Sequence, residues 1–239
     1  MESEDKNAEP VTSQAFDLVA AGNVSAAVAA ITARVDTLAA LEAFAQVRGR
    51  AYHDLKSVPT MIAIAWEAVD FALKRAAASP DSENARRCKA RARAIAYNAG
   101  ADCWPGWGDP VEIKSADIGE GLKLAERSYE LVEELDLGDE ARGGAIWLIG
   151  ALQMAFGHWS TAIEQFSRAE KAFHAAHLPA NAAMARGYAA LASRALPESH
   201  LRSAESLAAV LQSLQAMQSR EAQFFADQLV TADRIFSSH

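Results

Sequence analysis

The chain has 239 residues, of which 51% are hydrophobic and 23% charged, so it can bury a sizeable core and is not disordered throughout. Its formal net charge of −8 disfavours a general affinity for nucleic acid, because nucleic-acid-binding proteins normally carry a basic field.

The start of the chain and its cysteines indicate a cytoplasmic protein. Residues 1–10 are acidic and polar, unlike a signal peptide, and predict a disordered tail. Cys88 and Cys103 form no CxxC pair, so we expect two reduced thiols. Residues 143–163 carry no formal charge, but their apolar part stops at Gly157-His158, short of the roughly 20 residues that a bilayer requires. We therefore expect no membrane span.

Helical periodicity runs along most of the chain and predicts paired helices. Alanine is abundant, and apolar residues recur at three- and four-residue steps, which is typical of amphipathic helices. Pro59, Pro179 and Pro197 mark helix starts or breaks, and Asp117-x-x-Glu120 has the spacing of a capping box. The predicted hairpins are 12–21 with 24–35, 36–53 with 59–78, 82–101 with 117–136, 139–156 with 159–177, and 179–195 with 198–217, followed by a capping helix at 219–236.

One long segment, residues 102–116, interrupts the helical pattern within the third hairpin. Its sequence, DCWPGWGDPVEIKSA, holds two prolines, two glycines and two tryptophans. Prolines and glycines end a helix, and two large aromatic residues favour a compact loop. We expect an ordered, Trp-rich loop insertion here.

The clearest repeated unit is Ala145–Phe173. Gly157 breaks its helical pattern, and Thr161-x-x-Glu164 has capping-box spacing, which predicts a helix, a tight turn and a second helix. Small, turn and aromatic residues within this unit are placed as in a tetratricopeptide repeat, which the unit resembles. The positions that carry the resemblance are Gly150, Gly157, Ala162, Phe166 and Ala169.

Weaker copies of this pattern lie at Gly22–Arg34, Ala68–Ala72, Gly121–Leu131 and Tyr188–Leu211, spaced more widely than the usual ~34 residues. The resemblance implies an all-α fold, a right-handed α-α superhelix (solenoid) of about five antiparallel helical hairpins plus a C-terminal capping helix. It also implies one tetratricopeptide-like helical-repeat domain over residues 11–239.

The leading functional hypothesis is a non-enzymatic interaction module, a scaffold or adaptor that binds a protein or peptide in the concave groove of the stack. Trp147 falls one residue after the usual core aromatic position of the repeat. That offset turns Trp147 toward the groove, with Met154 on the same stripe. The alternative is that Trp147 simply fills the core.

A second hypothesis is a small-ligand sensor with a pocket under the Trp-rich loop. Trp104, Trp107 and Asp109 are predicted to lie on the same rim as His158 and Trp159 of the next hairpin. Tryptophan is enriched at binding hot spots, so one ring could line a pocket or hold a partner. The alternative is that both loop tryptophans pack down as a plug over the hairpin ends.

A basic stripe is a further candidate contact for an anion. Arg86, Lys89 and Arg93 share one helical face by their three- and four-residue spacing. The helix around Glu126–Glu134 is strongly acidic and belongs to the same hairpin, so mutual neutralisation or solvation is the alternative.

No catalytic, phosphate-binding or dinucleotide motif is present, and we expect no enzyme and no cofactor. An enzyme would need a convergence of acidic and imidazole groups, drawn from Asp102, Asp109, His158 and His53. His53, His158 and His200 each fall near a hairpin turn, but turns of successive hairpins lie too far apart to share a metal. His174 and His177 suit a helix C-terminus instead. No metal is therefore expected, and homo-oligomerisation is compatible with every hypothesis.

Overall fold

The computed structural model describes residues 8–34, 36–80, 82–196 and 200–237, and every regular element in these ranges is helical. The all-α prediction is confirmed. The α-helices are α1 (Ala8–Ala20), α2 (Val24–Arg34), α3 (Thr37–His53), α4 (Val58–Ala77), α5 (Glu83–Asp102), α6 (Ser115–Leu135), α7 (Gly138–Ala155), α8 (Trp159–Ala175), α9 (Pro179–Ser193), α10 (His200–Ala216) and α11 (Arg220–Phe236), with a short 3-10 helix, η2 (Pro105–Trp107).

All but one of these helices begin and end within two residues of the predicted positions. The exception is the start of α1, at Ala8 rather than residue 12. Pro10 lies in the first turn, where a missing backbone N–H costs no helical hydrogen bond. The expected disordered tail is therefore wrong for residues 8–10, and its remainder lies outside the described residues, as does Pro197.

Helix α7 ends at the turn that the sequence predicts. Gly157 adopts a left-handed conformation with φ +80, and the N–H of His158 donates to the carbonyl of Gln153 at 2.9 Å. The Gly157 N–H donates to the Met154 carbonyl at 3.0 Å, which completes a Schellman motif. Gly22 ends α1 in the same way, with φ +80.

Both predicted capping boxes are misplaced. Helix α8 begins at Trp159, so Thr161 lies inside it, and His158 at the N-cap position makes no side-chain cap. Asp117 lies in the third position of α6, and its Oδ2 accepts from the Lys114 backbone N–H at 2.8 Å. The acid thus reaches back to the chain before the helix, which is the role of the distal residue of a capping box.

The chain divides into two compact units. The first consists of Met1–Cys103 and Val111–Leu131, and the second of Trp104–Pro110 and Val132–His239. The single domain over 11–239 and its right-handed superhelix stay predictions.

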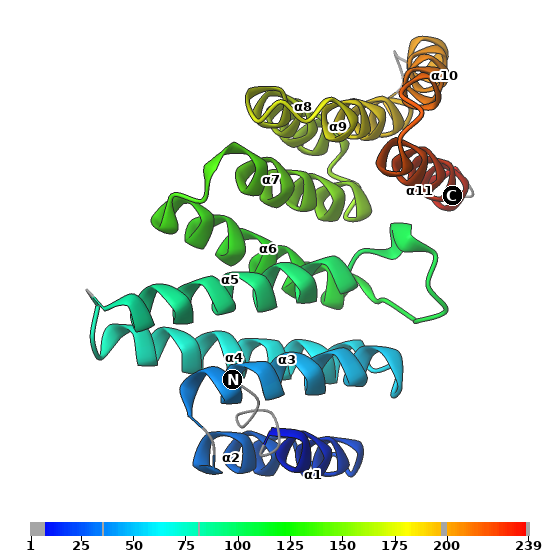
Figure 1. Ribbon diagram of the computed structural model, residues 1–239. Coiled ribbons are helices and arrows are strands. Elements are labelled where there is room, and N and C mark those ends of the chain that lie inside the picture. The colour runs from blue at the N-terminus through cyan, green and yellow to red at the C-terminus, as the bar shows by residue number, and fades with distance from the viewer. Residues whose placement is uncertain (1–7, 35, 81, 197–199, 238–239) are drawn as a thin grey trace. The chain divides into compact units, whose positions relative to one another are not determined.

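In the first unit, helices α1 to α5 pack as successive neighbours (Figure 1). Its core is aliphatic and aromatic, with Leu41, Phe44, Tyr52 and Ile64 at 1% exposure or less. Arg48 of α3 is nearly buried and pairs with Asp102 at the end of α5. The pair links two helices through a charge that would be costly to bury alone.

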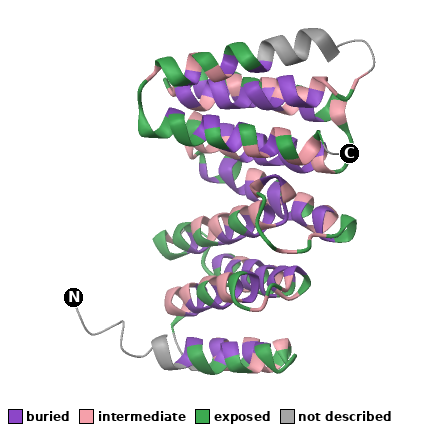
Figure 2. Ribbon diagram, turned by 90° about the vertical axis from the view of Figure 1, so that its right-hand side faces the viewer, coloured by how far each residue is buried: buried purple, intermediate pink, exposed green. Residues whose placement is uncertain are grey.

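In the second unit, glycines allow close approach of neighbouring helices, and buried residues line the facing sides (Figure 2). A Cβ at Gly150 of α7 would lie 2.9 Å from Cε1 of Phe166 in α8. A Cβ at Gly187 of α9 would lie 2.5 Å from Cδ1 of Leu229 in α11. Real Cβ atoms essentially never come so close, so a larger residue at either glycine would force the facing side chain to shift.

Candidate functional site

The Trp-rich loop is ordered and wraps around one buried ring. It occupies residues 103–114 between α5 and α6, and Trp104 has no exposed surface. A Cβ at Gly106 would overlap the Trp104 indole, so only glycine lets the 3-10 turn fold over this ring. A Cβ at Gly108, whose φ is +73, would lie 3.3 Å from Cγ2 of Thr231, which places the loop against α11.

Trp104 is the centre of an aromatic cluster within the second unit. Its ring centroid lies 4.8 Å from that of Trp107, 5.7 Å from Trp147 and 5.5 Å from Tyr188. It also stacks on Phe236 of α11 at 6.4 Å. For Trp104, the plug interpretation is the one that the structure supports.

Trp147 does not face an open groove, and the expected orientation is wrong. Its side chain is 4% exposed, and Met154, on the same predicted stripe, is 1% exposed. The Trp104, Trp107 and Tyr188 rings cover Trp147 from the loop and from α9. The one-residue offset turned the ring toward these neighbours rather than toward solvent.

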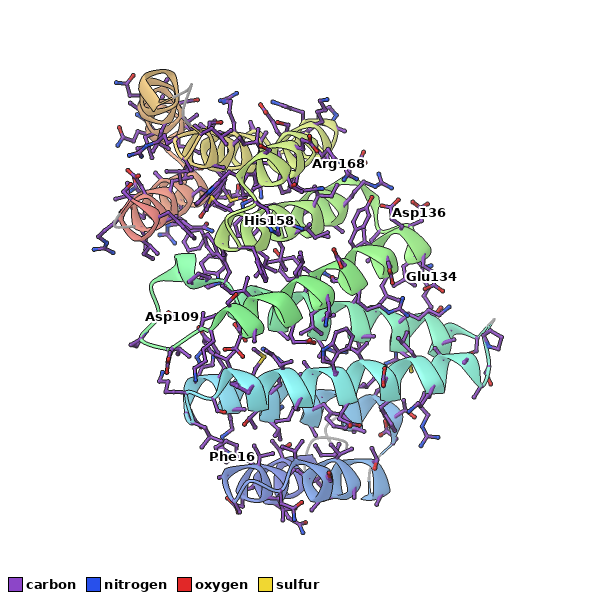
Figure 3. The ribbon with its side chains drawn as sticks, turned by 180° about the vertical axis from the view of Figure 1, so that it is seen from behind. Phe16, Asp109, Glu134, Asp136, His158 and Arg168 are labelled. Carbon is purple, nitrogen blue, oxygen red and sulfur yellow. The ribbon has the colours of Figure 1, made fainter. Side chains whose placement is uncertain are left out.

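His158, Trp159 and Asp109 occupy different settings in this unit. His158 is exposed at the turn between α7 and α8 (Figure 3). Its ring stacks on that of Phe156, and its Nδ1 lies 2.7 Å from Oε1 of Gln153. Trp159 is half-buried, and its ring packs edge-on against Phe236. Asp109 is exposed on the loop. Phe236 thereby connects Trp159 to the Trp104 cluster.

Beside the aromatic cluster lies a cavity of about 660 Å³. It opens where the C-terminal ends of α7, α9 and α11 come together with the first residue of α8. Its walls are mainly apolar. The lining residues are Met154, Ala155, Phe156, Gly157, Trp159, Leu191, Arg194, Ala195, Asp233, Phe236 and Ser237.

One ion pair supplies the charges of the cavity wall. Arg194 of the α9 C-cap donates through Nη1 to Oδ1 of Asp233 on α11, and Ser237 Oγ donates to the same Oδ1 at 2.8 Å. The Arg194 and Asp233 side chains are 29% and 35% exposed, so solvent reaches both. The pair ties α9 to α11 at the mouth of the cavity.

Three buried polar atoms in the aromatic cluster lack a hydrogen-bond partner within the described part of the chain. Nε1 of Trp104 and Nε1 of Trp147 are buried without an acceptor among the described residues. Burial raises the pKa of Tyr188 well above its ordinary value, and the nearby Gln228 amide offsets this rise in part. The Tyr188 hydroxyl nevertheless makes no hydrogen bond of ordinary geometry with the described protein. The phenol therefore stays neutral at physiological pH.

The predicted anion contact lies on α5 in the first unit. Arg86 is exposed, Lys89 and Arg93 are half-buried, and the Arg93 carbonyl accepts from Ser128 Oγ of α6 at 3.2 Å. In the acidic helix, Glu130 pairs with Arg127 of the same helix. A role of Arg86, Lys89 and Arg93 toward an anion stays a prediction.

The acids and histidines considered for catalysis are divided between the two units. Asp102 pairs with Arg48 in the first, where His53 is exposed and packs edge-on against Tyr52. Asp109 and His158 belong to the second. Among the described residues, no cluster of three or more His, Cys, Asp or Glu could hold a metal ion. The side chain of His200 lies outside the described part.

None of the described helices is long and apolar enough to cross a bilayer.

Sequence reasoning missed most of the residues that line the cavity, among them Arg194, Asp233, Phe236 and Leu191. Arg194 and Asp233 are 39 residues apart, and no motif connects them. The available signal was their shared position near helix C-termini. A position near a helix C-terminus predicts a shared site only when the helices are known to end side by side.

Comparisons with known proteins add little to this description. No protein-family model matches the chain, and no curated protein matches it. Solved structures that match include one described as "Computational Design of Self-Assembling Cyclic Protein Homooligomers". That chain is 16% identical, the match covers 98% of this chain and 92% of that one, and the TM-score is 0.35. So low a TM-score supports no conclusion about fold or assembly.

Proposed function

We propose that this chain is a non-catalytic binding protein whose cavity at the C-terminal ends of α7, α9 and α11 receives a small, mainly apolar ligand. The observation that carries the proposal is the cavity itself. Its volume of about 660 Å³ lies within the ~300–1,000 Å³ typical of small-molecule pockets. Apolar walls with few polar groups are also typical of such sites.

The aromatic wall of the cavity supports the proposal because packing against buried rings fixes its position. Phe236 lies between Trp159 and the buried Trp104, in contact with both rings. Rings fixed by packing lose little further freedom when a ligand binds, which favours affinity. The loop thus contributes to the site as the support of its wall.

A non-catalytic role is supported by the chemistry of the lining. Asp233 accepts from both Arg194 and Ser237, and the described lining holds no histidine or cysteine that could act as a base or thiol nucleophile. Binding of a protein or peptide in a concave groove, and self-association, stay predictions. The burial of Trp147 removes the main residue that was assigned to such a groove.

The proposal is tested with the neutral fluorescent probe N-phenyl-1-naphthylamine, whose emission rises in apolar surroundings. We expect saturable enhancement with the full chain. Ala195→Phe places a ring at the exposed edge of the cavity and is expected to weaken probe binding several-fold. Ala175→Phe, on an exposed position at the end of α8, is the matched control and should leave binding unchanged. Absence of saturable binding, or equal loss in both variants, would contradict the proposal.

A further inference from the structure

We infer that the ligand of this cavity is an organic ammonium ion, an apolar body that carries one positively charged nitrogen. The inference rests on the proposed function, because it assigns chemistry to the same cavity. It follows from three independent features of the lining: the hydrogen bonding of Asp233, the helix ends around the cavity, and the aromatic walls.

Asp233 has one carboxylate oxygen to spare. Both side-chain donors, Arg194 Nη1 and Ser237 Oγ, reach Oδ1. Among the described residues, Oδ2 accepts no hydrogen bond. A carboxylate oxygen offers two acceptor positions, so an N–H donor of a ligand can bind Oδ2 while Arg194 keeps its place.

The helix ends around the cavity favour positive charge. Phe156, Arg194 and Ser237 are the C-cap residues of α7, α9 and α11, and all three line the cavity. A helix C-terminus carries roughly half a negative charge, and the α8 N-terminus at Trp159 carries a similar positive one. Three negative ends against one positive end leave the cavity negative, since Arg194 and Asp233 cancel each other.

The same balance argues against an anionic ligand. Arg194 is the only basic residue among the described lining residues, and its guanidinium is already paired with Asp233. An anion would have to break that pair and would meet three helix C-termini. A cation meets neither obstacle.

The aromatic walls supply the third feature. Trp159, Phe236 and Phe156 line the cavity, and the Phe156 side chain is 38% exposed. The face of an aromatic ring attracts a cation, and the attraction grows when the cation leaves water. The rings also accept the apolar body of the ligand.

The test compares three probes of one shape by calorimetry on the full chain: phenethylammonium, neutral 2-phenylethanol and anionic 3-phenylpropionate. We expect phenethylammonium to bind tightest and 3-phenylpropionate weakest. Asp233→Asn should weaken phenethylammonium binding about tenfold or more, as loss of a hydrogen bond to a charged group does, and should weaken 2-phenylethanol binding far less, because a neutral hydroxyl gains less from a carboxylate. Asp227→Asn removes an exposed carboxylate from the same helix and should change neither.

Arg194→Gln separates a binding role from a structural one. The variant removes a positive charge that competes with the ligand beside Asp233, so phenethylammonium should bind more tightly. If Arg194 only maintained the structure of the cavity, its removal would weaken the binding of every probe. If 2-phenylethanol binds as tightly as phenethylammonium, the inference is wrong and the proposed function stands. If none of the three probes binds, the inference is wrong, and the proposed function is then decided by the N-phenyl-1-naphthylamine test. Equal losses in Asp233→Asn and Asp227→Asn would also overturn the inference.

Discussion

The indole ring of Trp104 packs edge-on against that of Trp147, with 5.7 Å between the ring centroids and an angle of 76° between the planes. One ring comes from the loop and the other from α7. Edge-to-face pairs of this kind stabilise beyond the area that they bury. The contact joins two residues that the sequence suggested for different surfaces, and it makes both part of the support behind the cavity.

Trp104→Ala is expected to lower the free energy of unfolding by about 3–5 kcal/mol, the usual cost of removing a large buried aromatic side chain. Trp107→Ala is the matched control, because Trp107 lies in the same loop but is only half-buried. Its cost should be clearly smaller. Urea unfolding followed by circular dichroism measures both, and equal losses would contradict the deeper burial of Trp104.

Gly150→Ala and Gly49→Ala are expected to change stability in opposite directions. A Cβ at Gly150 would meet the buried Phe166 ring at 2.9 Å, and such overpacking costs about 1–3 kcal/mol. Gly49 lies inside α3 with nothing within 4 Å of the new Cβ. Alanine should stabilise that helix by about 0.5–1 kcal/mol. Thermal unfolding of the two variants tests this, and a destabilised Gly49→Ala would contradict the open space at that position.

Asp102→Ala is expected to destabilise by about 3 kcal/mol or more, because it leaves the nearly buried Arg48 guanidinium without its partner. Arg48→Met combined with Asp102→Ala should recover part of the loss, since no uncompensated charge remains. A double-mutant cycle in urea measures the coupling. Strictly additive losses would mean that the two side chains act independently.

Cys103 is expected to resist thiol reagents while the protein is folded. Its side chain is fully buried, and burial, followed by the charges of Asp102, Asp117 and Glu120, raises the pKa of the thiol. A raised pKa in the folded state means that this contribution to stability is complete below the unfolded value of about 8.5 and is lost as the pH rises above it.

Two measurements follow for Cys103. Labelling by a disulfide reagent at pH 8 should be slow in the native protein and fast in urea. The stability of wild type relative to Cys103→Ala should fall between about pH 8 and 10. Rapid native labelling at this residue, with Cys88→Ala used to isolate its signal, would contradict the buried position.

The sequence by itself determined the helices and many of their ends. Periodicity of apolar residues is a local property, and so is the left-handed turn that Gly22 and Gly157 adopt. The places of Gly150 and Phe166 in the repeat pattern were also visible in the sequence, whereas their contact is a finding of the structure. The capping boxes failed because their spacing fits a helix interior as well as a helix start.

Only the tertiary structure decided the site. The direction of Trp147 on a helix covered by the loop and by α9 depends on what packs around it, and spacing alone pointed to solvent. The cavity depends on α7, α9 and α11 ending together, which brings Arg194 beside Asp233 and Phe236 beside Trp159. Such contacts arise from packing between distant segments, whereas helical periodicity records only neighbours along the chain.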